Sequence, residues 1–297
     1  MYIRKLLEDY QTSTPTPVYP KRIPLKRALQ DEEPEASTAR QKSYRSWVHR
    51  LAYAATWTRL DISYSVGQLA RYCGRAGPSH WEALHYLMGY LTNRPSLHLR
   101  YRRGDPKEDP LGGYVDADWG NHGSRSMTGM IALFNGTPIA WKSKLQPSVA
   151  LSTSEAEYMS ASVGAKEMIY LRRLMANLAM PMRYATPVGE DNTGCIEWAN
   201  YVIGGRERAK HIDLRKHFAH EAVQNGEIIL YKVSTRDQLA DILTKGLSKM
   251  PFDHCVEGLF GARGTTSKPA RKAVIGKSLR CSRLKRGTWN GRLRATK

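Results

Sequence analysis

Acidic residues are scarce in this chain of 297 residues, which has 27 Asp and Glu against 46 Lys and Arg. The resulting net charge of +19 points to a polyanionic partner and argues against a cationic one. The shortage is most extreme in residues 262–297, which contain 12 Lys and Arg and no acid, so residues 1–261 carry only +7 (19 − 12). This tail also lacks apolar periodicity, and we expect it to be disordered and to contact phosphates without sequence preference.

Cysteine pairs and long apolar runs are also missing. The four cysteines lie far apart without a CxxC pair, which excludes a disulfide framework or a zinc ribbon and favours a reducing compartment. No stretch of about 18 apolar residues is present, which excludes a membrane-spanning helix, and the first residues lack the apolar core of a signal peptide. We therefore expect a soluble intracellular protein, cytoplasmic or nuclear, with no membrane partner.

The first 103 residues divide into a proline-rich part and a helical part. Residues 1–42 begin with a short amphipathic piece, YIRKLLEDY, after which prolines at positions 15, 17, 20, 24 and 34 predict an extended linker. Apolar residues then recur at three- and four-residue steps, and Pro78 opens a second amphipathic helix. Residues 43–103 are therefore predicted to be a helical segment, with a strand-like alternation only at 97–102.

Residues 111–261 alternate between strand and helix patterns. Two apolar runs flank the turn Asn135–Gly136, which is a strong hairpin signal, and Ser152 with Glu155 forms a capping box that starts a long helix. The remaining elements are strands at 111–118, before Asp191 and at 227–233, and helices that end near Tyr201 or cover 211–225 and 236–246. The order β-β-β-α-β-α-α-β-α predicts an α/β fold, a five-stranded mixed sheet flanked by helices, which we expect to fold by itself.

Acidic residues at four places stand out, because a basic protein has little reason to gather carboxylates unless they bind a cation. The first is Asp116, which alternates with Val115 and Ala117 on a strand and shares one strand face with Asp118. Two acids on one face of a buried strand are costly without a cation. The alternative is that both lie in water at the end of the strand.

Glu157 is the second acid, and it lies in the first turns of the long helix. Steps of four and three residues from it give an otherwise apolar or small-residue stripe: Ala161, Gly164, Met168, Leu171 and Met175. This stripe must face the sheet, so Glu157 is predicted to lie at the inner edge of a packed helix, where an acid needs a partner. A surface glutamate that reaches into solvent is the alternative.

Asp191 and Asp241 complete the set. Asp191 follows a strand, where ligands of α/β sheets bind, although a helix N-cap explains it equally well. Asp241 stands four residues before Lys245, and a surface ion pair between them is an adequate explanation by itself. A cluster of all four would be a Mg²⁺ site, and two such ions about 3.5–4 Å apart are the usual device for breaking phosphodiesters.

Several of these motifs occur together, in the same order, in one family. GYVDADWG, RSMTGMIALFNGTPIAWKSKLQPSVALSTSEAEYMSA, EDNTGCIEWAN, KHIDLRKHF and DQLADILTK resemble the ribonuclease H domain of copia-type retrotransposon polyproteins. YRSWVHRLAYAATWTRLDISYSVGQLARY and HWEALHYLMGYL are similar to the connection between the reverse transcriptase and this domain. The resemblance covers residues 43–261 and implies that residues 1–42 are a remnant of the reverse transcriptase. Leu60 departs from the family pattern, which usually has proline there.

The resemblance implies an RNase H-like fold and an enzyme that cuts the RNA strand of RNA–DNA hybrids during reverse transcription. It implies that Asp116, Glu157, Asp191 and Asp241 are both the catalytic residues and the ligands of two Mg²⁺ ions, or of Mn²⁺ in their place. Lys142, Lys144, Lys210, Arg215 and Lys216 are the candidate phosphate contacts. The implied partners are the hybrid and the reverse transcriptase of the parent polyprotein, in a retrotransposon particle. The alternative is a non-catalytic relic that only binds nucleic acid.

Overall fold

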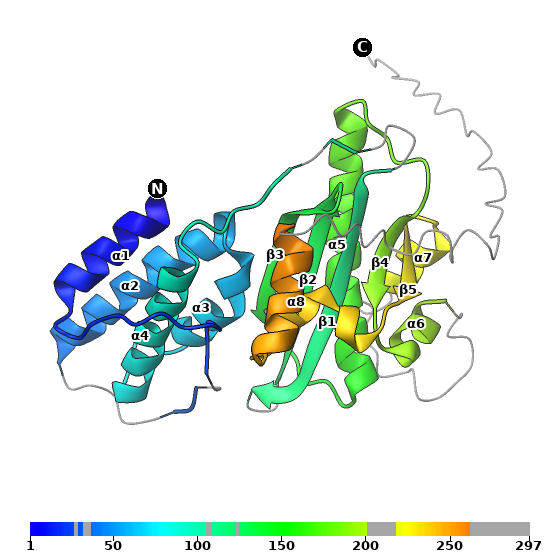
Figure 1. Cartoon of the computed structure of the whole chain (residues 1–297). Helices are drawn as coiled ribbons and strands as arrows, with labels where there is room; N and C mark the ends of the chain where they lie inside the picture. The colour runs from blue at the N-terminus through cyan, green and yellow to red at the C-terminus, as the bar shows by residue number, and fades with distance from the viewer. Residues whose placement is uncertain are drawn as a thin grey trace, which may run out of the picture.

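The computed structural model describes residues 1–26, 29–31, 37–101, 103–104, 109–122, 125–200 and 218–261. A five-stranded sheet with helices on both faces forms one part of the molecule, and helices from the N-terminal residues lie beside it (Figure 1). The basic tail 262–297 lies outside the described residues, so the prediction of disorder there stays a prediction.

The sheet has the strand order β3-β2-β1-β4-β5. Its strands are β1 (Leu111–His122), β2 (Arg125–Phe134), β3 (Thr137–Leu145), β4 (Thr186–Glu190) and β5 (Ile228–Lys232). β2 pairs antiparallel with β1 and β3, whereas β4 pairs parallel with β1 and β5. The mixed five-stranded sheet predicted from the sequence is confirmed.

The two kinds of pairing follow from two kinds of connection. Asn135 and Gly136 have φ of 49° and 80°, the left-handed conformation that a two-residue hairpin turn needs and that Asn and Gly adopt most readily. The parallel step from the hairpin to β4 instead runs through the long helix α5 (Thr153–Asn177). β1 is therefore the strand at which the pairing changes direction, and α/β sheets commonly bind their ligands at such a point.

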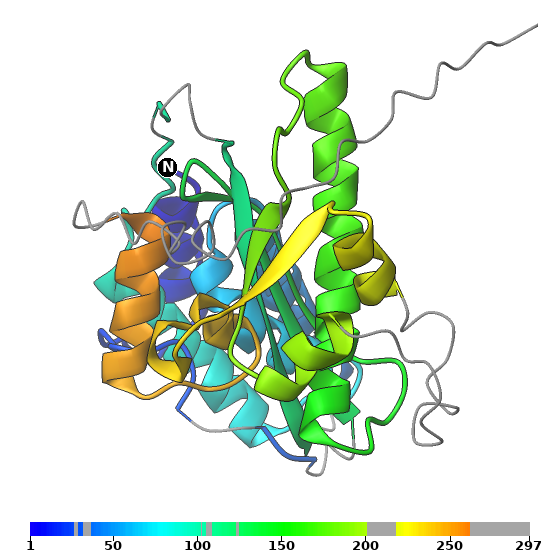
Figure 2. The ribbon, with the colours of Figure 1, turned by 90° about the vertical axis from the view of Figure 1, so that its right-hand side faces the viewer.

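Different elements cover the two faces of the sheet (Figure 2). One face packs against α5, with α6 (Thr193–Asn200) and α7 (Phe218–Gln224) beside it. On the other face lie the 3-10 turns η4 (Thr235–Asp237) and η5 (Leu239–Leu243) and the helix α8 (Lys249–Phe260). We call the first of these the α5 face of the sheet and the second the η5 face.

The helix predicted over 236–246 is wrong, because this segment forms η4 and η5 instead. Gln238 between the two turns is extended, with φ −74° and ψ 93°. Its side chain donates a hydrogen bond of 2.8 Å to the backbone oxygen of Val115 on β1. This bond ties the chain to the sheet at the point where an α-helix would have to continue. The apolar pattern indicates burial correctly but does not reveal this anchor.

The N-terminal part of the chain is helical. It contains α1 (Tyr2–Ser13), α2 (Thr38–Trp57), the 3-10 turn η1 (Leu60–Ile62), α3 (Ser63–Ala70) and α4 (Pro78–Asn93). We call residues 1–101 the helical segment. None of the helices in the described part of the chain has the length and apolar character needed to cross a bilayer.

Two predictions for the helical segment are wrong in part. The amphipathic piece expected at the start of residues 1–42 forms α1, which buries Ile3, Leu6 and Tyr10 within the apolar cluster of the helical segment. The rest of residues 1–42 is not extended throughout, because α2 already begins at Thr38. The strand predicted at 97–102 is irregular chain over the described residues 97–101. It is attached to β3 through side chains, as in the hydrogen bond of 2.7 Å from the hydroxyl of Thr137 to the carbonyl of Arg100.

Buried apolar residues form two large clusters. The first lies between the sheet and α5, and all its fully buried members come from residues 111–230. The second lies on the η5 face and joins Ile131 of the sheet and Ile242 of η5 to Leu51 and Leu84 of the helical segment. The helical segment and the sheet thus share one core. Whether residues 111–261 fold by themselves stays a prediction.

Candidate active site

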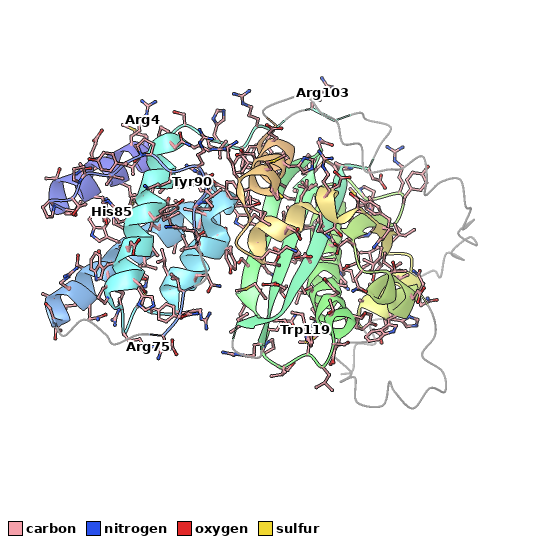
Figure 3. All side chains as sticks on the ribbon, turned by 60° about the horizontal axis from the view of Figure 1, so that its bottom comes forward. Arg4, Arg75, His85, Tyr90, Arg103 and Trp119 are labelled. Carbon is pink, nitrogen blue, oxygen red and sulfur yellow. The ribbon has the colours of Figure 1, made fainter. Side chains whose placement is uncertain are left out.

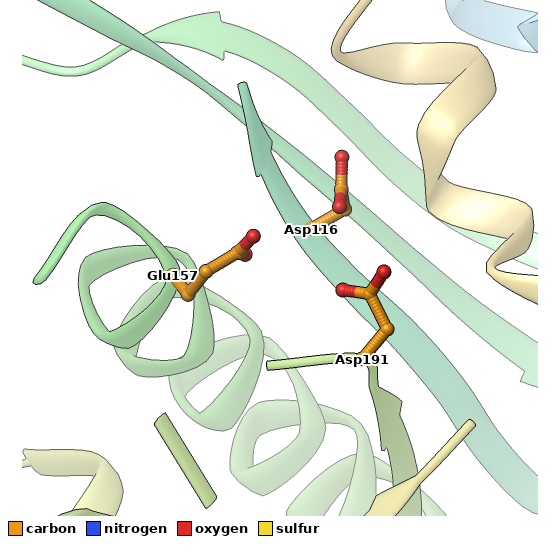
Figure 4. Close-up of side chains that lie close together, drawn as sticks. All are labelled: Asp116, Glu157 and Asp191. Carbon is orange, nitrogen blue, oxygen red and sulfur yellow. The ribbon is translucent and has the colours of Figure 1, made fainter. Parts of the chain in front are cut away.

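Three acidic side chains meet at one end of the sheet (Figure 4). Asp116 comes from β1, Glu157 from the second turn of α5, and Asp191 from the residue after β4. Each offers a carboxylate oxygen that lies within 4.8 Å of the other two. The pairing of β1 with β4 ends at Tyr114 and Gly189, so the three acids lie beyond the point where these strands stop pairing. The fold thus brings together three of the four predicted carboxylates.

Asp116 and Glu157 are buried, with only 1% and 4% of their surface exposed. Glu157 lies on the buried stripe of α5, and this helix starts where the sequence predicts: the hydroxyl of Ser152 accepts a hydrogen bond of 3.2 Å from the N–H of Glu155. Oε2 of Glu157 has no hydrogen-bond partner among the described residues. Solvent-exposed alternatives for Asp116 and Glu157 are therefore wrong, and a buried carboxylate oxygen without a donor needs another partner.

Asn192, and not Asp191, caps the start of α6. Its Oδ1 accepts hydrogen bonds from the N–H of Cys195 (2.9 Å) and from the hydroxyl of Ser154 (3.2 Å). Ser154 lies one turn before Glu157, so Asn192 links the two elements that carry Glu157 and Asp191. The N-cap explanation of Asp191 is wrong, and its carboxylate belongs to the acidic cluster instead.

Asp241 approaches from the η5 face. It is 7% exposed, and its Oδ1 lies 2.8 Å from the ammonium of Lys245. The ion pair expected from the sequence spacing is confirmed, but it is not a surface pair, because Asp241 is buried. The same ammonium also lies 3.9 Å from Oδ2 of the buried Asp116. The hydroxyl of Thr244 donates a further hydrogen bond to Asp116. Asp116 therefore lies between Glu157 and Asp191 on one side and Asp241 on the other. Asp241 is already paired with Lys245.

Burial, together with neighbouring charges, raises the pKa of Asp116, Glu157 and Asp241. Burial, followed by the charges of neighbouring carboxylates, raises the pKa of Glu157 to about 11. Burial and the charge of Asp116 raise the pKa of Asp241 to about 7, although Lys245 opposes the rise. Burial alone would lower the pKa of Lys245, but the charges of Asp116 and Asp241 outweigh it and raise that pKa. The site therefore has more negative charge than its own cation can balance.

A further buried acid beside the cluster, Glu190, was not singled out from the sequence. It is the last residue of β4 and is fully buried; Oε1 accepts a hydrogen bond of 2.8 Å from the N–H of Asn192, whereas Oε2 has no partner among the described residues. Burial raises its pKa to about 8, against the hydrogen bond from Asn192 and with help from the charges of Asp116 and Asp191. Glu190 is the last residue of a buried strand and directly precedes the candidate ligand Asp191, and this position is the signal that could have identified it.

Two of the predicted phosphate contacts, Lys142 and Lys144, are exposed on the edge strand β3. Lys142 pairs with Glu167 of α5 at 2.6 Å, and Lys144, two residues further on, points to the same face of the sheet. Asp116 lies in the cross-strand row of Gly129, which faces η5. The two lysines are therefore not part of the carboxylate cluster. The other three predicted contacts lie outside the described residues: Lys210, Arg215 and Lys216.

The donor set suits a hard divalent cation. Mg²⁺ prefers oxygen ligands, and three carboxylates converge here around an oxygen of Glu157 that has no donor. The group contains no His or Cys, which are the ligands typical of zinc sites. The residues present therefore fit a magnesium-type site.

The strand order and the cluster of carboxylates at the end of the sheet are those of the RNase H-like fold that the sequence predicts. The chain is 34% identical over 265 residues to the retrovirus-related Pol polyprotein from transposon TNT 1-94 of Nicotiana tabacum, a match that covers 86% of this chain and 19% of the relative. It is 35% identical over 216 residues to the Pol polyprotein from transposon RE2 of Arabidopsis thaliana, covering 71% of this chain and 14% of the relative. The chain belongs to these retrovirus-related Pol proteins and is of the copia type; it spans less than a fifth of the length of either relative.

No family model matches the chain. Among solved structures, an RNase H1 isolated from compost aligns with a TM-score of 0.33 and 15% identity, over 46% of this chain and 93% of that protein. The N-terminal RNase H domain of a Mycobacterium tuberculosis protein aligns with a TM-score of 0.32 and 19% identity, over 50% and 97%. The RNase H-like fold assigned to this chain rests on its own strand order and strand directions.

Proposed function

We propose that this chain is a ribonuclease that cuts the RNA strand of an RNA–DNA hybrid, with Asp116, Glu157, Asp191 and Asp241 as its catalytic carboxylates. The observation that carries the proposal is the convergence of three of these acids from β1, α5 and the end of β4, with oxygens within 4.8 Å of one another. Membership of the Pol family supports it, because reverse transcription produces such hybrids.

The four carboxylates would hold two Mg²⁺ ions, with Mn²⁺ as the alternative metal. Asp116 is the residue suited to be shared, because it lies next to the acids of the α5 face and next to Asp241. Bound Mg²⁺ supplies charge stabilisation at phosphate oxygens and lowers the pKa of a coordinated water. The protein's part is to keep the carboxylates buried and oriented, since electrostatic interactions are stronger away from bulk water.

Recognition of the hybrid would rely on its shape, its 2′-hydroxyls and its phosphates, and not on base sequence. Lys142 and Lys144 are exposed on the α5 face of β3 and are the described candidates for phosphate contacts. Lys142 would exchange its partner Glu167 for a phosphate oxygen. The second partner proposed is the reverse transcriptase part of a Pol polyprotein, within a retrotransposon particle.

The proposal is tested with a labelled RNA–DNA hybrid and the full chain, with Mg²⁺ and with EDTA. Wild type should cut only the RNA strand and only with the metal, and Asp191→Asn should lose about a hundredfold or more of this activity while staying folded. Glu221→Gln, an exposed acid on α7, is the matched control and should cleave like wild type. Hybrid binding without cleavage by wild type would favour the non-catalytic alternative, and wild-type cleavage by Asp191→Asn would contradict the assigned site.

A further inference from the structure

We infer that the helical segment is a structural part of the active site, because η1 and α3 hold the turn that carries Asp241 against the sheet. The inference rests on the proposed function and adds a positioning role to residues far from Asp241 in the sequence. It concerns chiefly Tyr64, the second residue of α3.

The turn that carries Asp241 has little conformational stability of its own. η5 is a 3-10 helix of five residues, Leu239–Leu243, and 3-10 runs of this length are uncommon because their hydrogen bonds have poor geometry. All five residues are nevertheless buried. A short, poorly bonded turn that is buried on every side takes its shape from what packs around it.

The sheet provides one side of this packing. Gly129 on β2 lets η5 come close: a Cβ at this position would lie 2.6 Å from Cγ2 of Thr244 and 2.9 Å from the backbone oxygen of Ala240. The hydroxyl of Ser143 on β3 donates a hydrogen bond of 2.6 Å to the carbonyl of Leu243. The sheet thus fixes how close η5 lies, but it touches only one side of the turn.

The helical segment provides the other side. η1 and α3 both contact η5, and Ile62 and Ile242 belong to the same buried cluster. The ring of Tyr64 lies against Gly246, at the end of the loop that follows η5: a Cβ on Gly246 would be 3.9 Å from Cε1 of the ring. Tyr64 is 5% exposed and also packs with Met127 of β2. This one side chain therefore bridges the helical segment, the sheet and the loop that contains Lys245.

A small cavity marks the same junction. Asp61, Tyr64 and Ser65 of the helical segment line it together with Ile242, Lys245 and Gly246. Burial, and then the charge of Asp118, raise the pKa of Tyr64 to about 12, so its hydroxyl lies near the acidic end of β1. The loop that carries Lys245, the cation of Asp241, is thus lined on its outer side by the helical segment.

Contacts farther out hold the two parts together. Nε1 of Trp141 on β3 donates a hydrogen bond of 2.8 Å to the carbonyl of Ala55. Tyr90 of α4, labelled in Figure 3, packs edge-on against Phe252 of α8 with ring centroids 5.5 Å apart. The helical segment is therefore docked firmly enough to hold a turn in place.

The other three carboxylates do not depend on this contact. Asp116 comes from β1, Glu157 from a helix of 25 residues, and Asp191 from the residue after β4. The cluster between the sheet and α5 has no fully buried member from the helical segment. Loosening the helical segment should therefore disturb Asp241, Lys245 and the hydrogen bond from Thr244 to Asp116, and leave the elements that carry the three-acid cluster in place.

The test compares Tyr64→Ala with Leu6→Ala in the full chain. Leu6 is fully buried in α1, which contacts α2 and α4 and lies at the far side of the helical segment from the sheet (Figure 1). Backbone hydrogen exchange over residues 239–245, measured without metal, should speed up in Tyr64→Ala and stay unchanged in Leu6→Ala. Should Tyr64→Ala fail to fold, Tyr64→Leu keeps an apolar side chain there and takes its place. Equal exchange in the two variants would overturn the inference.

Cleavage provides the second readout. Tyr64→Ala should lower the rate by up to about tenfold, which is the loss expected when Asp241 itself is replaced, because a displaced carboxylate loses its productive position. In an Asp241→Asn background measured with Mn²⁺, the same substitution should have little further effect, because its target is already lost. Full, multiplicative loss in that background would show that Tyr64 acts elsewhere and would overturn the inference. A wild type that does not cleave would remove the proposed function, while the exchange comparison would still decide the role of Tyr64.

Discussion

The two faces of the sheet support their parts of the site in different ways. On the α5 face, Glu157 is carried by a 25-residue helix, and the core behind it comes from residues 111–230. On the η5 face, Asp241 is carried by a five-residue 3-10 turn, and the core behind it is shared with the helical segment. Within the described part of the chain, the carboxylates of Glu157 and Asp191 form no ion pair, whereas on the η5 face Lys245 lies 2.8 Å from Asp241.

This difference separates two requirements of a carboxylate site. Acids on long, regular elements are held rigidly, so their mutual repulsion can be kept until a divalent ion neutralises it. An acid on a short turn would move away from the others, and an internal ammonium together with outside packing keeps it in place. We expect substitutions on the α5 face to weaken mainly the binding of the metal. We expect substitutions on the η5 face to alter mainly the position of Asp241.

The largest effect should come from removing one acid on each face. Glu157→Gln should lower hybrid cleavage about a hundredfold or more, because it removes a carboxylate that we propose as a metal ligand. Asp241→Asn should lower it only about tenfold, because Asp241 already shares its charge with Lys245. Steady-state cleavage over a range of Mg²⁺ concentrations measures both. Equal losses would show that the two faces contribute alike and would contradict the comparison.

A smaller effect should come from pushing one element away from the sheet on each face. In Gly129→Ala the new Cβ would lie 2.9 Å from the backbone oxygen of Ala240, and in Gly164→Ala it would lie 2.4 Å from Cγ1 of Val115. Each should destabilise the protein by about 1–3 kcal/mol through overpacking. Hydrogen exchange should rise over 239–245 in Gly129→Ala, and over α5 and β1 in Gly164→Ala. The same exchange pattern in both variants would contradict the separate support of the two faces.

The smallest effect concerns stability against pH without metal. Glu190 has an ordinary pKa of 4.5 and a folded pKa of about 8, so the folded state holds its proton more tightly than the unfolded state does. Its contribution to stability is therefore complete below about pH 4.5 and is lost as pH rises through about 8. Asp241 acts in the same direction over a lower window, from 3.8 to about 7.

Thermal unfolding in EDTA should therefore show lower stability at pH 8 than at pH 5.5, with a drop in Tm of roughly 3 °C or more. Glu190→Gln should flatten the dependence above pH 7, because the neutral amide has no proton to lose. Excess Mg²⁺ should restore stability at pH 8 by favouring the ionised carboxylates. Stability that rises between pH 5.5 and pH 8 in EDTA would show that these acids are not crowded as described.

Local patterns in the sequence predicted the elements of the α5 face well. The Asn135–Gly136 turn, the helix start at Ser152 and the stripe that contains Glu157 are all as expected. Each depends on residues within a few positions of one another. The η5 face was predicted poorly, because the shape of 236–246 depends on the hydrogen bond from Gln238 to Val115, more than a hundred positions away along the chain.

The same distinction applies to the site. The sequence by itself indicated that Asp116 and Glu157 stand where a charge needs a partner, whereas Asp191 and Asp241 joined the set through the resemblance to the copia-type family. Only the tertiary structure decided that Asn192 and not Asp191 caps α6, that Glu190 is buried beside the cluster, and that Lys245 faces Asp116 as well as Asp241. The physical reason is that burial and charge–charge distances arise between elements, whereas periodicity and capping arise within them.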